Sequence, residues 1–275
     1  SLAQLDKLYL NRHEKTVFSD WKKQGNKIIG FFETYVPEEV IYAAHILPIR
    51  ILGTLERPSL TQLTANCCPF MRSGFDLALR GKYDYIDGVV AADTCDTASR
   101  FFHLWEDNIR PPYSYHICLP HNLPSERVYN FFNAETAKFK QSLEKYFEKD
   151  ITDESLWDAI KVYNENRALL KRVYELRKSD PPIIKGSEAI EASITSMITP
   201  KDHHNKLLQK LLEDIVNRNE LPSKGPRLLI TGSIVDYIEL FKLVEDCGGN
   251  VVADDLSSGS RYFWNDVDTS ISNPL

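Results

Sequence analysis

The first 124 residues alternate short apolar runs with segments that carry helix signals. Pro37 suits the first turn of a helix, and Glu38 and Glu39 suit its amino end. This β-α-β-α alternation predicts a mostly parallel sheet covered by helices. The apolar runs are KIIGFF (27–32), PIRILG (48–53), YIDGVVAA (85–92) and YSYHICLP (113–120).

The remaining residues predict two further regions. Residues 125–222 carry apolar residues at helical spacing with charged faces, which indicates a helical linker or cap. Residues 227–255 read as one β-α-β unit, from RLLITG to NVVADD. We therefore expect an α/β protein with two Rossmann-like or flavodoxin-like parallel-sheet domains. Residues 1–124 form the first domain, residues 125–222 join the two, and residues 223–275 begin a second domain that we expect to be incomplete, as in a piece of a longer protein.

Composition narrows the class of protein. The formal net charge is −6 and the basic residues are dispersed, which argues against a nucleic-acid groove. No apolar stretch reaches the length of a membrane span and the amino end does not resemble a signal peptide, so we expect a cytoplasmic protein without a membrane partner. Five cysteines, an odd number, are few for a disulfide scaffold. In a reducing compartment such thiols are buried, metal-bound or reactive.

Three of these cysteines fall where strands are expected to end. Cys95 follows the run 85–92 at the amino end of a predicted helix, where backbone N–H groups and the helix dipole favour a thiolate. Cys67 and Cys68 follow the run 48–53, so both segments belong to the carboxyl edge of the sheet. Adjacent side chains diverge, so we expect only one of Cys67 and Cys68 to face a shared ion. The alternative is that these thiols are simply packed in tight turns.

Other polar residues allow both a structural and a functional interpretation. Arg72 lies one helical turn after Cys68 and either faces the same site or lies on the surface. We expect Cys118 and Cys247 to be structural, and His203 and His204 to be solvated on a polar helix.

Three stretches together resemble the subunits of 2-hydroxyacyl-CoA dehydratases and benzoyl-CoA reductases. The resemblance extends in order over nearly the whole chain, although the helical middle matches only in character. The stretches are GFFETYVPEEVIYAAHILPIRILG, CPFMRSGFDLALRGKYDYIDGVVAADTCDT and RLLITGSIVDYIELFKLVEDCGGNVVADDLSSGSRYFW.

The resemblance implies a 4Fe–4S cluster held by three cysteines. The family's Cys-x-x-x-Arg motif corresponds to Cys68 and Arg72, and its Cys-Asp motif corresponds to Cys95. No residue here matches the third ligand, which we expect beyond residue 275, and Ser257 stands where the family often has a cysteine. Three thiolates leave one iron open, as in catalytic metal sites.

The family's chemistry implies the partners and the reaction. A separate ATP-hydrolysing iron–sulfur activator supplies a low-potential electron, and ATP is not bound by this chain. The electron converts the acyl-CoA thioester into a ketyl radical anion, which leads to dehydration or to reduction of an aromatic ring. A related second subunit would complete a heterodimer that encloses the acyl-CoA. The sequence does not separate dehydratase from reductase, although RYFW and DTCDT favour the reductase slightly.

The segment ETYVPEE follows the run 27–32 and supplies the remaining candidates. The resemblance places Thr34 near the substrate, and we predict catalytic roles for Thr34 and Glu38. We predict that Glu33, Tyr35 and Arg72 bind substrate. Glu38 equally suits the ordinary role of a first-turn helix charge.

Two alternatives from other classes stay open. One is a non-catalytic iron–sulfur protein of the same superfamily that relays electrons, which would need more cysteine ligands. The other is a metal-free scaffold subunit in which both cysteines are only packed.

Overall fold

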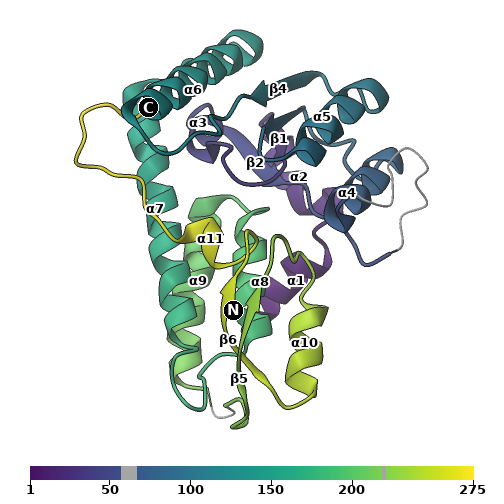
Figure 1. Cartoon of the computed structure of the whole chain (residues 1–275), viewed down its shortest axis with the longest axis vertical. Coiled ribbons are helices and arrows are strands. Elements are labelled where there is room, and N and C mark those ends of the chain that lie inside the picture. The colour runs from purple at the N-terminus through teal and green to yellow at the C-terminus, as the bar shows by residue number, and fades with distance from the viewer. Residues whose placement is uncertain (57–66, 219–220) are drawn as a thin grey trace. The chain divides into compact units, whose positions relative to one another are not determined.

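A computed structural model describes residues 1–56, 67–218 and 221–275, and these form two compact units (Figure 1). The four-stranded unit comprises Glu14–Lys161 and Asp268–Leu275, and the two-stranded unit comprises Ser1–His13 and Val162–Val267. The helices of the predicted linker, 125–222, contribute to both units, and the amino-terminal helix belongs to the two-stranded unit.

The described residues contain alternating helices and strands, as expected for an α/β protein. No helix within the described ranges is both long and apolar enough to span a bilayer. The four-stranded unit holds η1 (Lys15–Phe18), α2 (Ser19–Lys23), β1 (Lys27–Phe31), α3 (Glu38–Ala43), β2 (Ile46–Arg50), α4 (Pro69–Leu79), β3 (Gly88–Ala92), α5 (Asp96–Asn108), β4 (Tyr113–Ile117), α6 (Glu126–Phe147) and the first part of α7 (Asp153–Glu175). The two-stranded unit holds α1 (Leu2–Leu10), the rest of α7, α8 (Gly186–Ser196), α9 (Lys201–Val216), β5 (Arg227–Thr231), α10 (Glu239–Asp246), β6 (Asn250–Asp255) and α11 (Ser260–Phe263).

The larger sheet is entirely parallel and has the strand order β2-β1-β3-β4. The predicted parallel α/β architecture is therefore confirmed. β2 begins at Ile46, two residues before the predicted run, so Pro48 lies inside the strand opposite Ile29. Proline donates no ladder hydrogen bond, and β2 is the outer strand in this order, where proline is tolerated.

Alternate residues of β1 face two different cores, as the period of a strand requires. Ile29 and Phe31 join a cluster with residues of α3, α6 and α7. On the other face lies an aromatic cluster from α4, α5 and the end of β1, in which Trp105 is fully buried. Its edge-on and tilted ring contacts are Phe32–Phe101 (4.8 Å), Phe32–Trp105 (5.2 Å), Phe75–Phe101 (5.3 Å) and Phe101–Trp105 (5.8 Å). The sheet is thus covered by helices on both faces.

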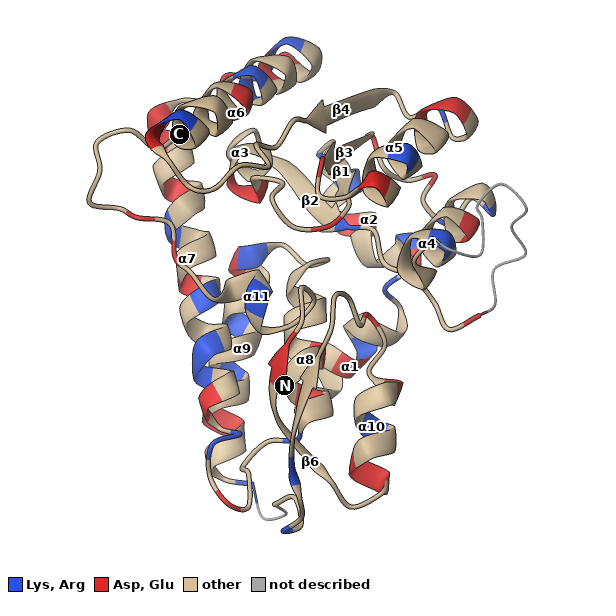
Figure 2. Ribbon diagram, viewed as in Figure 1, with Lys and Arg blue, Asp and Glu red and all other residues tan. Residues whose placement is uncertain are grey.

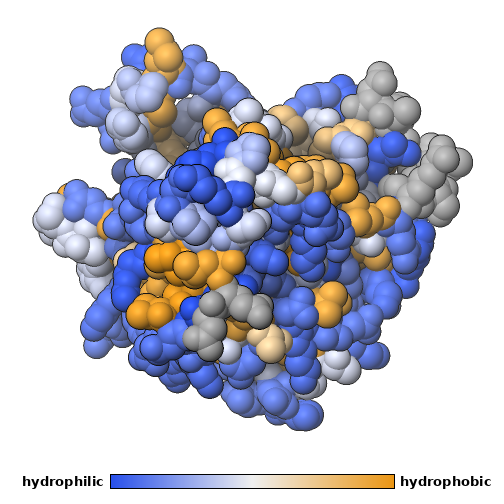
Figure 3. Space-filling view, turned by 90° about the horizontal axis from the view of Figure 1, so that it is seen from below, coloured by the Kyte–Doolittle hydropathy of each residue, from blue (hydrophilic) through white to orange (hydrophobic). Residues whose placement is uncertain are grey.

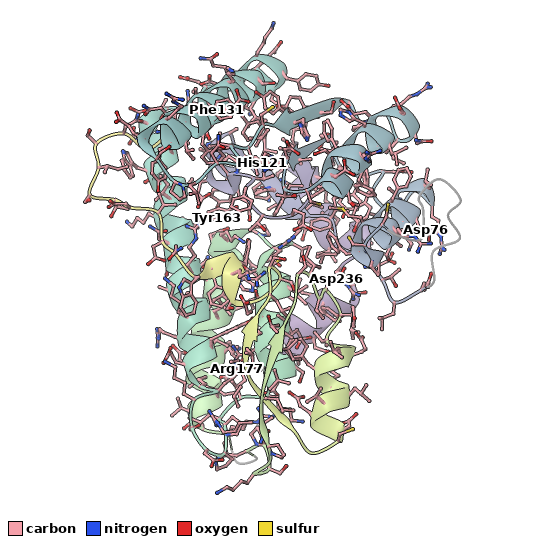
Figure 4. All side chains as sticks on the ribbon, in the orientation of Figure 1. Asp76, His121, Phe131, Tyr163, Arg177 and Asp236 are labelled. Atoms are coloured by element: carbon pink, nitrogen blue, oxygen red, sulfur yellow. The ribbon has the colours of Figure 1, made fainter. Side chains whose placement is uncertain are left out.

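In the two-stranded unit, the parallel pair β5–β6 packs against α8 and α10. The start of α8 approaches β6 so closely that position 186 must be a glycine. A Cβ on Gly186 would lie 2.5 Å from the Val251 carbonyl oxygen. A buried ion pair joins Arg177 to Asp254 at 3.0 Å, and Asp254 also accepts the Ser260 N–H at 2.7 Å. These contacts secure the carboxyl end of β6, and Figure 4 marks Arg177.

The predicted solvated position of His204 is wrong. His204 is fully buried, and its ring nitrogens lie 3.0 Å from Asn166 Nδ2 and 3.2 Å from Thr195 Oγ1. Burial, followed by the charge of Lys201, holds the pKa of His204 well below its usual value. His203, by contrast, is exposed as expected. The adjacent pair therefore divides between the core and the surface, as helix geometry allows.

The aromatic cluster generates a stability prediction. Trp105→Ala removes a fully buried ring, so we expect the free energy of unfolding to fall by about 3–5 kcal/mol. The matched control is Phe131→Ala, which truncates a ring that is 44% exposed in the same unit (Figure 4) and should change stability by no more than about 0.5 kcal/mol. Urea denaturation followed by circular dichroism measures both, and equal losses would contradict the described packing.

Candidate functional site

The strand order defines where a ligand site is expected on the four-stranded unit. The chain leaves β1 toward β2 on one side, whereas β3 lies on the other side of β1. The segments that follow β1 and β3 therefore diverge at a topological switch point. In open parallel sheets, ligands bind at the carboxyl ends of the strands at such a point. Glu33, Thr34 and Tyr35 follow β1, and Asp93, Thr94 and Cys95 follow β3.

Two cysteines cap the helices that begin at this edge. Cys68 is the N-cap of α4 and Cys95 is the N-cap of α5. The Met71 N–H donates to Cys68 Sγ at 3.5 Å, and the Ala98 N–H donates to Cys95 Sγ at 3.4 Å. Each sulfur therefore occupies the acceptor position that a serine or aspartate oxygen takes at an ordinary N-cap. Both thiols are exposed, so a ligand can reach them.

The Glu33 carboxyl lies beside these thiols and is held by a buried arginine. Arg50 ends β2, is 1% exposed, and places its Nη2 3.5 Å from Glu33 Oε2. Desolvation raises the pKa of Glu33, while the Arg50 charge and the hydrogen bond from the Thr34 N–H lower it and offset part of the increase. Arg50 was not predicted, although a basic residue that ends an otherwise apolar strand is a signal for a buried ion pair.

The charges that act on the Cys68 thiol indicate that Glu33 and Cys95 lie near it. Desolvation raises the pKa of the Cys68 thiol, and the charges of Glu33, Cys95 and Cys67 raise it further, against the lowering effect of the Met71 N–H. Such effects fade with distance in water, so the interacting groups lie near one another. The structure thus brings Cys68, Cys95 and Glu33 together from three separate segments. A positive charge placed between them would favour the thiolates.

The loop after β1 holds two residues in the left-handed backbone region. Glu33 has φ 53° and Tyr35 has φ 73°, and neither is a glycine. Backbone strain of this kind costs about 1–3 kcal/mol per residue and clusters at functional sites. Tyr35 is also 63% exposed. The loop therefore combines strain and exposure at the switch point.

The structure places the remaining predicted residues without testing their roles. Arg72 lies one turn along α4 from Cys68, and its buried Nε has no hydrogen-bond partner within the described residues. Glu38 is the first residue of α3 and is only 6% exposed, a position that suits the first-turn charge as well as the predicted catalytic role. Thr34 lies between the two strained residues.

Sequence reasoning missed a polar cluster beside Cys95. Asp93 accepts a hydrogen bond from Ser99 Oγ at 2.5 Å, and the Nε2 of His121, which follows β4, lies 3.3 Å from the Asp93 carboxylate (Figure 4). The Ser99 hydrogen bond, then His121, lower the pKa of Asp93. The buried Thr94 hydroxyl has no hydrogen-bond partner in the described part of the chain. The pattern DTCDT contained this signal, because its polar residues directly follow a buried strand.

The other cysteines do not complete a metal site within the described residues. Cys118 and Cys247 are exposed, so the expectation that they pack structurally is not met. Cys118 influences the pKa values of Tyr115 and Lys138, which places it near α6. In the described ranges, no three His, Cys, Asp or Glu side chains are arranged to hold one metal ion. Cys68 and Cys95 therefore supply two ligands at most.

Comparison with known proteins gives a consistent set of relatives. A benzoyl-CoA reductase subunit of Thauera aromatica is 28% identical over 98% of this chain and 72% of its own length. The (R)-phenyllactyl-CoA dehydratase beta subunit of Clostridium sporogenes is 28% identical over 91% of this chain and 67% of its own length. The beta subunit of (R)-2-hydroxyglutaryl-CoA dehydratase from Acidaminococcus fermentans is 26% identical over 95% of this chain and 70% of its own length.

The fold and the site define an α/β protein in which two thiols and a carboxyl lie near one another at the carboxyl edge of a parallel sheet. The family model for 2-hydroxyglutaryl-CoA dehydratase, D-component, matches residues 33–275. The chain belongs to this family, and the resemblance identified from its sequence is confirmed.

The coupling between Glu33 and Cys68 generates a prediction. Glu33→Gln removes a charge that raises the pKa of Cys68, so we expect that pKa to fall. The rate of Cys68 alkylation by iodoacetamide against pH, followed by mass spectrometry in a Cys67→Ser background, measures the change. The control Glu56→Gln removes an exposed charge paired with Arg80 and should leave the profile unchanged. An unchanged or higher Cys68 pKa in Glu33→Gln would contradict the described arrangement.

Proposed function

We propose that this chain is the iron–sulfur subunit of a radical acyl-CoA enzyme of the benzoyl-CoA reductase or (R)-2-hydroxyacyl-CoA dehydratase type. Membership in the dehydratase family and the names of the relatives support a subunit of such an enzyme. The single observation that carries the proposal is the convergence of Cys68, Cys95 and Glu33 at one edge of a parallel sheet.

The proposed cofactor is a 4Fe–4S cluster with Cys68 and Cys95 as ligands. The chemistry of the site fits this group, because two accessible thiols sit at helix N-termini, and desolvation and nearby negative charge raise the pKa of Cys68. Cationic iron would reverse that balance and hold both sulfurs as thiolates. The third thiolate is proposed to come from outside the described residues, since they offer no third ligand group at this position.

The proposed substrate is an acyl-CoA thioester bound over the loop after β1. When bound, the cluster would pass a low-potential electron to this substrate. Glu33 and Tyr35 would contact the substrate from the strained loop, and Arg72 would offer its buried, unpartnered Nε–H to a negatively charged group. Thr34 and Glu38 are the proposed catalytic residues. The raised pKa of the neighbouring Glu33 also suits a group that holds or releases a proton during the reaction.

The proposed partners follow from the relatives, which are named as subunits of dehydratases and a reductase. A related second subunit would complete a heterodimer. A separate iron–sulfur activator would hydrolyse ATP and deliver the electron. Exposed cluster thiols require a reducing compartment, so we place the enzyme in the cytoplasm.

The test of the cofactor is anaerobic reconstitution of the full chain with iron and sulfide. We expect equal amounts of iron and sulfide to bind, with the absorption of an iron–sulfur cluster. The double variant Cys68→Ala/Cys95→Ala should lose both, whereas Cys118→Ala/Cys247→Ala, which removes two other exposed thiols, should retain them. Iron that survives in the first variant would refute the assignment, and absence of iron from the wild-type chain would favour a metal-free scaffold.

A turnover assay separates catalysis from electron relay. The loaded chain is combined with its second subunit, the activator, ATP and either benzoyl-CoA or a 2-hydroxyacyl-CoA. We expect a ring-reduced or dehydrated product, and the product identifies the reaction type. Oxidation of the activator without any acyl-CoA product would instead support the relay alternative.

A further inference from the structure

A polar cavity of about 680 Å³ lies within the two-stranded unit, separate from the cysteine site. Its walls come from α1, α8, α10 and residues near the end of α9, and its volume suits a small-molecule ligand. Figure 2 shows acidic residues on α1, α8 and α10, the helices that line it. Five acidic and three basic side chains line the cavity, so it is acidic overall.

Glu191, on α8, is a buried carboxyl with an oxygen that lacks a hydrogen-bond donor among the described residues. It is only 5% exposed, yet it lines the cavity, and the oxygen without a donor is Oε1. Asp6, on α1, lines the same cavity near Glu191. A buried carboxyl oxygen without a hydrogen-bond donor destabilises the folded state unless a ligand supplies the donor.

Two other carboxylates that line the cavity, Glu188 and Glu245, already have partners. Glu188 Oε2 accepts from Arg218 Nη1 at 2.8 Å and from the Lys185 N–H at 2.9 Å. Glu245 accepts from the Ser187 N–H at 2.9 Å and from Ser187 Oγ at 2.6 Å. These contacts fix the walls, and Glu191, with Asp6 nearby, is the buried carboxyl whose Oε1 lacks a donor among the described residues.

The charges around Glu191 set its protonation. Burial raises the pKa of Glu191 to about 8, and Asp6 and Glu188 raise it while Lys242 lowers it. The rim carries further charges from Asp246 and Lys185. With its pKa raised to about 8, Glu191 is mostly protonated at neutral pH when the cavity is empty.

We propose that this cavity binds a small organic cation through a primary ammonium group that donates N–H bonds to Glu191 and Asp6. An ammonium group has three donors and matches two adjacent carboxyls. A metal ion fits less well, because the described residues place no three acidic, histidine or cysteine ligands around one point. Arg218 is engaged with Glu188, which disfavours an anionic ligand at the same position. This inference does not depend on the proposed enzyme.

Binding is coupled to release of a proton. The cation stabilises ionised Glu191, so the proton of this carboxyl passes to the buffer while the ammonium keeps its own. The affinity should rise with pH up to about 8, the pKa of Glu191 in the unbound protein, and level off above it. No bond other than this O–H bond breaks.

The test is isothermal titration calorimetry of the full chain with 1,4-diaminobutane at pH 7, in phosphate and in MOPS buffer, neither of which carries a primary ammonium group. We expect saturable binding, with about one proton released per ligand as judged from the dependence of the heat on the buffer. Tetramethylammonium, a cation without N–H donors, and Mg²⁺ should bind at least tenfold more weakly. Equal binding of either would overturn the ammonium assignment.

Variants locate the site. Glu191→Gln keeps the shape of a residue that is mostly neutral at pH 7, so the fold should persist by circular dichroism. The affinity should fall at least tenfold and proton release should vanish. The control Glu213→Gln removes an exposed charge from α9, outside the cavity, and should bind like the wild type. No binding to the wild type, or unchanged binding to folded Glu191→Gln, would overturn the proposal.

Discussion

The electrostatic balance between two cap thiols and one carboxyl is the constraint on which the candidate site depends. Cys68 and Cys95 accept N–H bonds at the starts of α4 and α5. Desolvation and the charge of Glu33 raise the pKa of Cys68, against the lowering effect of the Met71 N–H. The buried Arg50 offsets only part of this negative charge, since it pairs with Glu33. A cation bound beside these groups would offset the remaining negative charge. The strand order places the groups at the edge where parallel sheets bind their ligands.

Most of the architecture could be predicted from sequence because it follows local rules. Apolar runs marked six strands, and the alternation with helices predicted parallel pairing. The carboxyl-edge position of Cys95 followed from one buried strand and one cap. The limits of the compact units could not be read locally, because α1 packs with α8 and α9 from the other end of the chain. Figure 3 illustrates a related limit: apolar residues gather in patches on this face of the surface, and Val216, Leu221 and Leu229 are among the exposed apolar side chains of the two-stranded unit.

The site was predictable in part. The motifs indicated Cys68, Cys95 and Glu33, but their convergence needed the strand order, which places β1 between β2 and β3. Arg50 and His121 were missed because their importance comes from partners distant in sequence. His204 was misplaced for the same reason: its burial depends on Asn166, which lies on another helix. Local pattern identifies the elements, whereas tertiary contacts decide which polar groups meet. The structure therefore adds Asp93 and Thr94 to the residues that surround Cys95.

The central claim is that Cys68 and Cys95 lie close enough to share one ligand. The most direct measurement is bridging by dibromobimane, which fluoresces strongly only after reacting with two nearby thiols. In the triple variant Cys67→Ser/Cys118→Ser/Cys247→Ser, only these two thiols are left. We predict one fluorescent bridge per chain, with mass spectrometry linking the Cys68 and Cys95 peptides. Single attachments to separate thiols, without a bridge, would contradict the account.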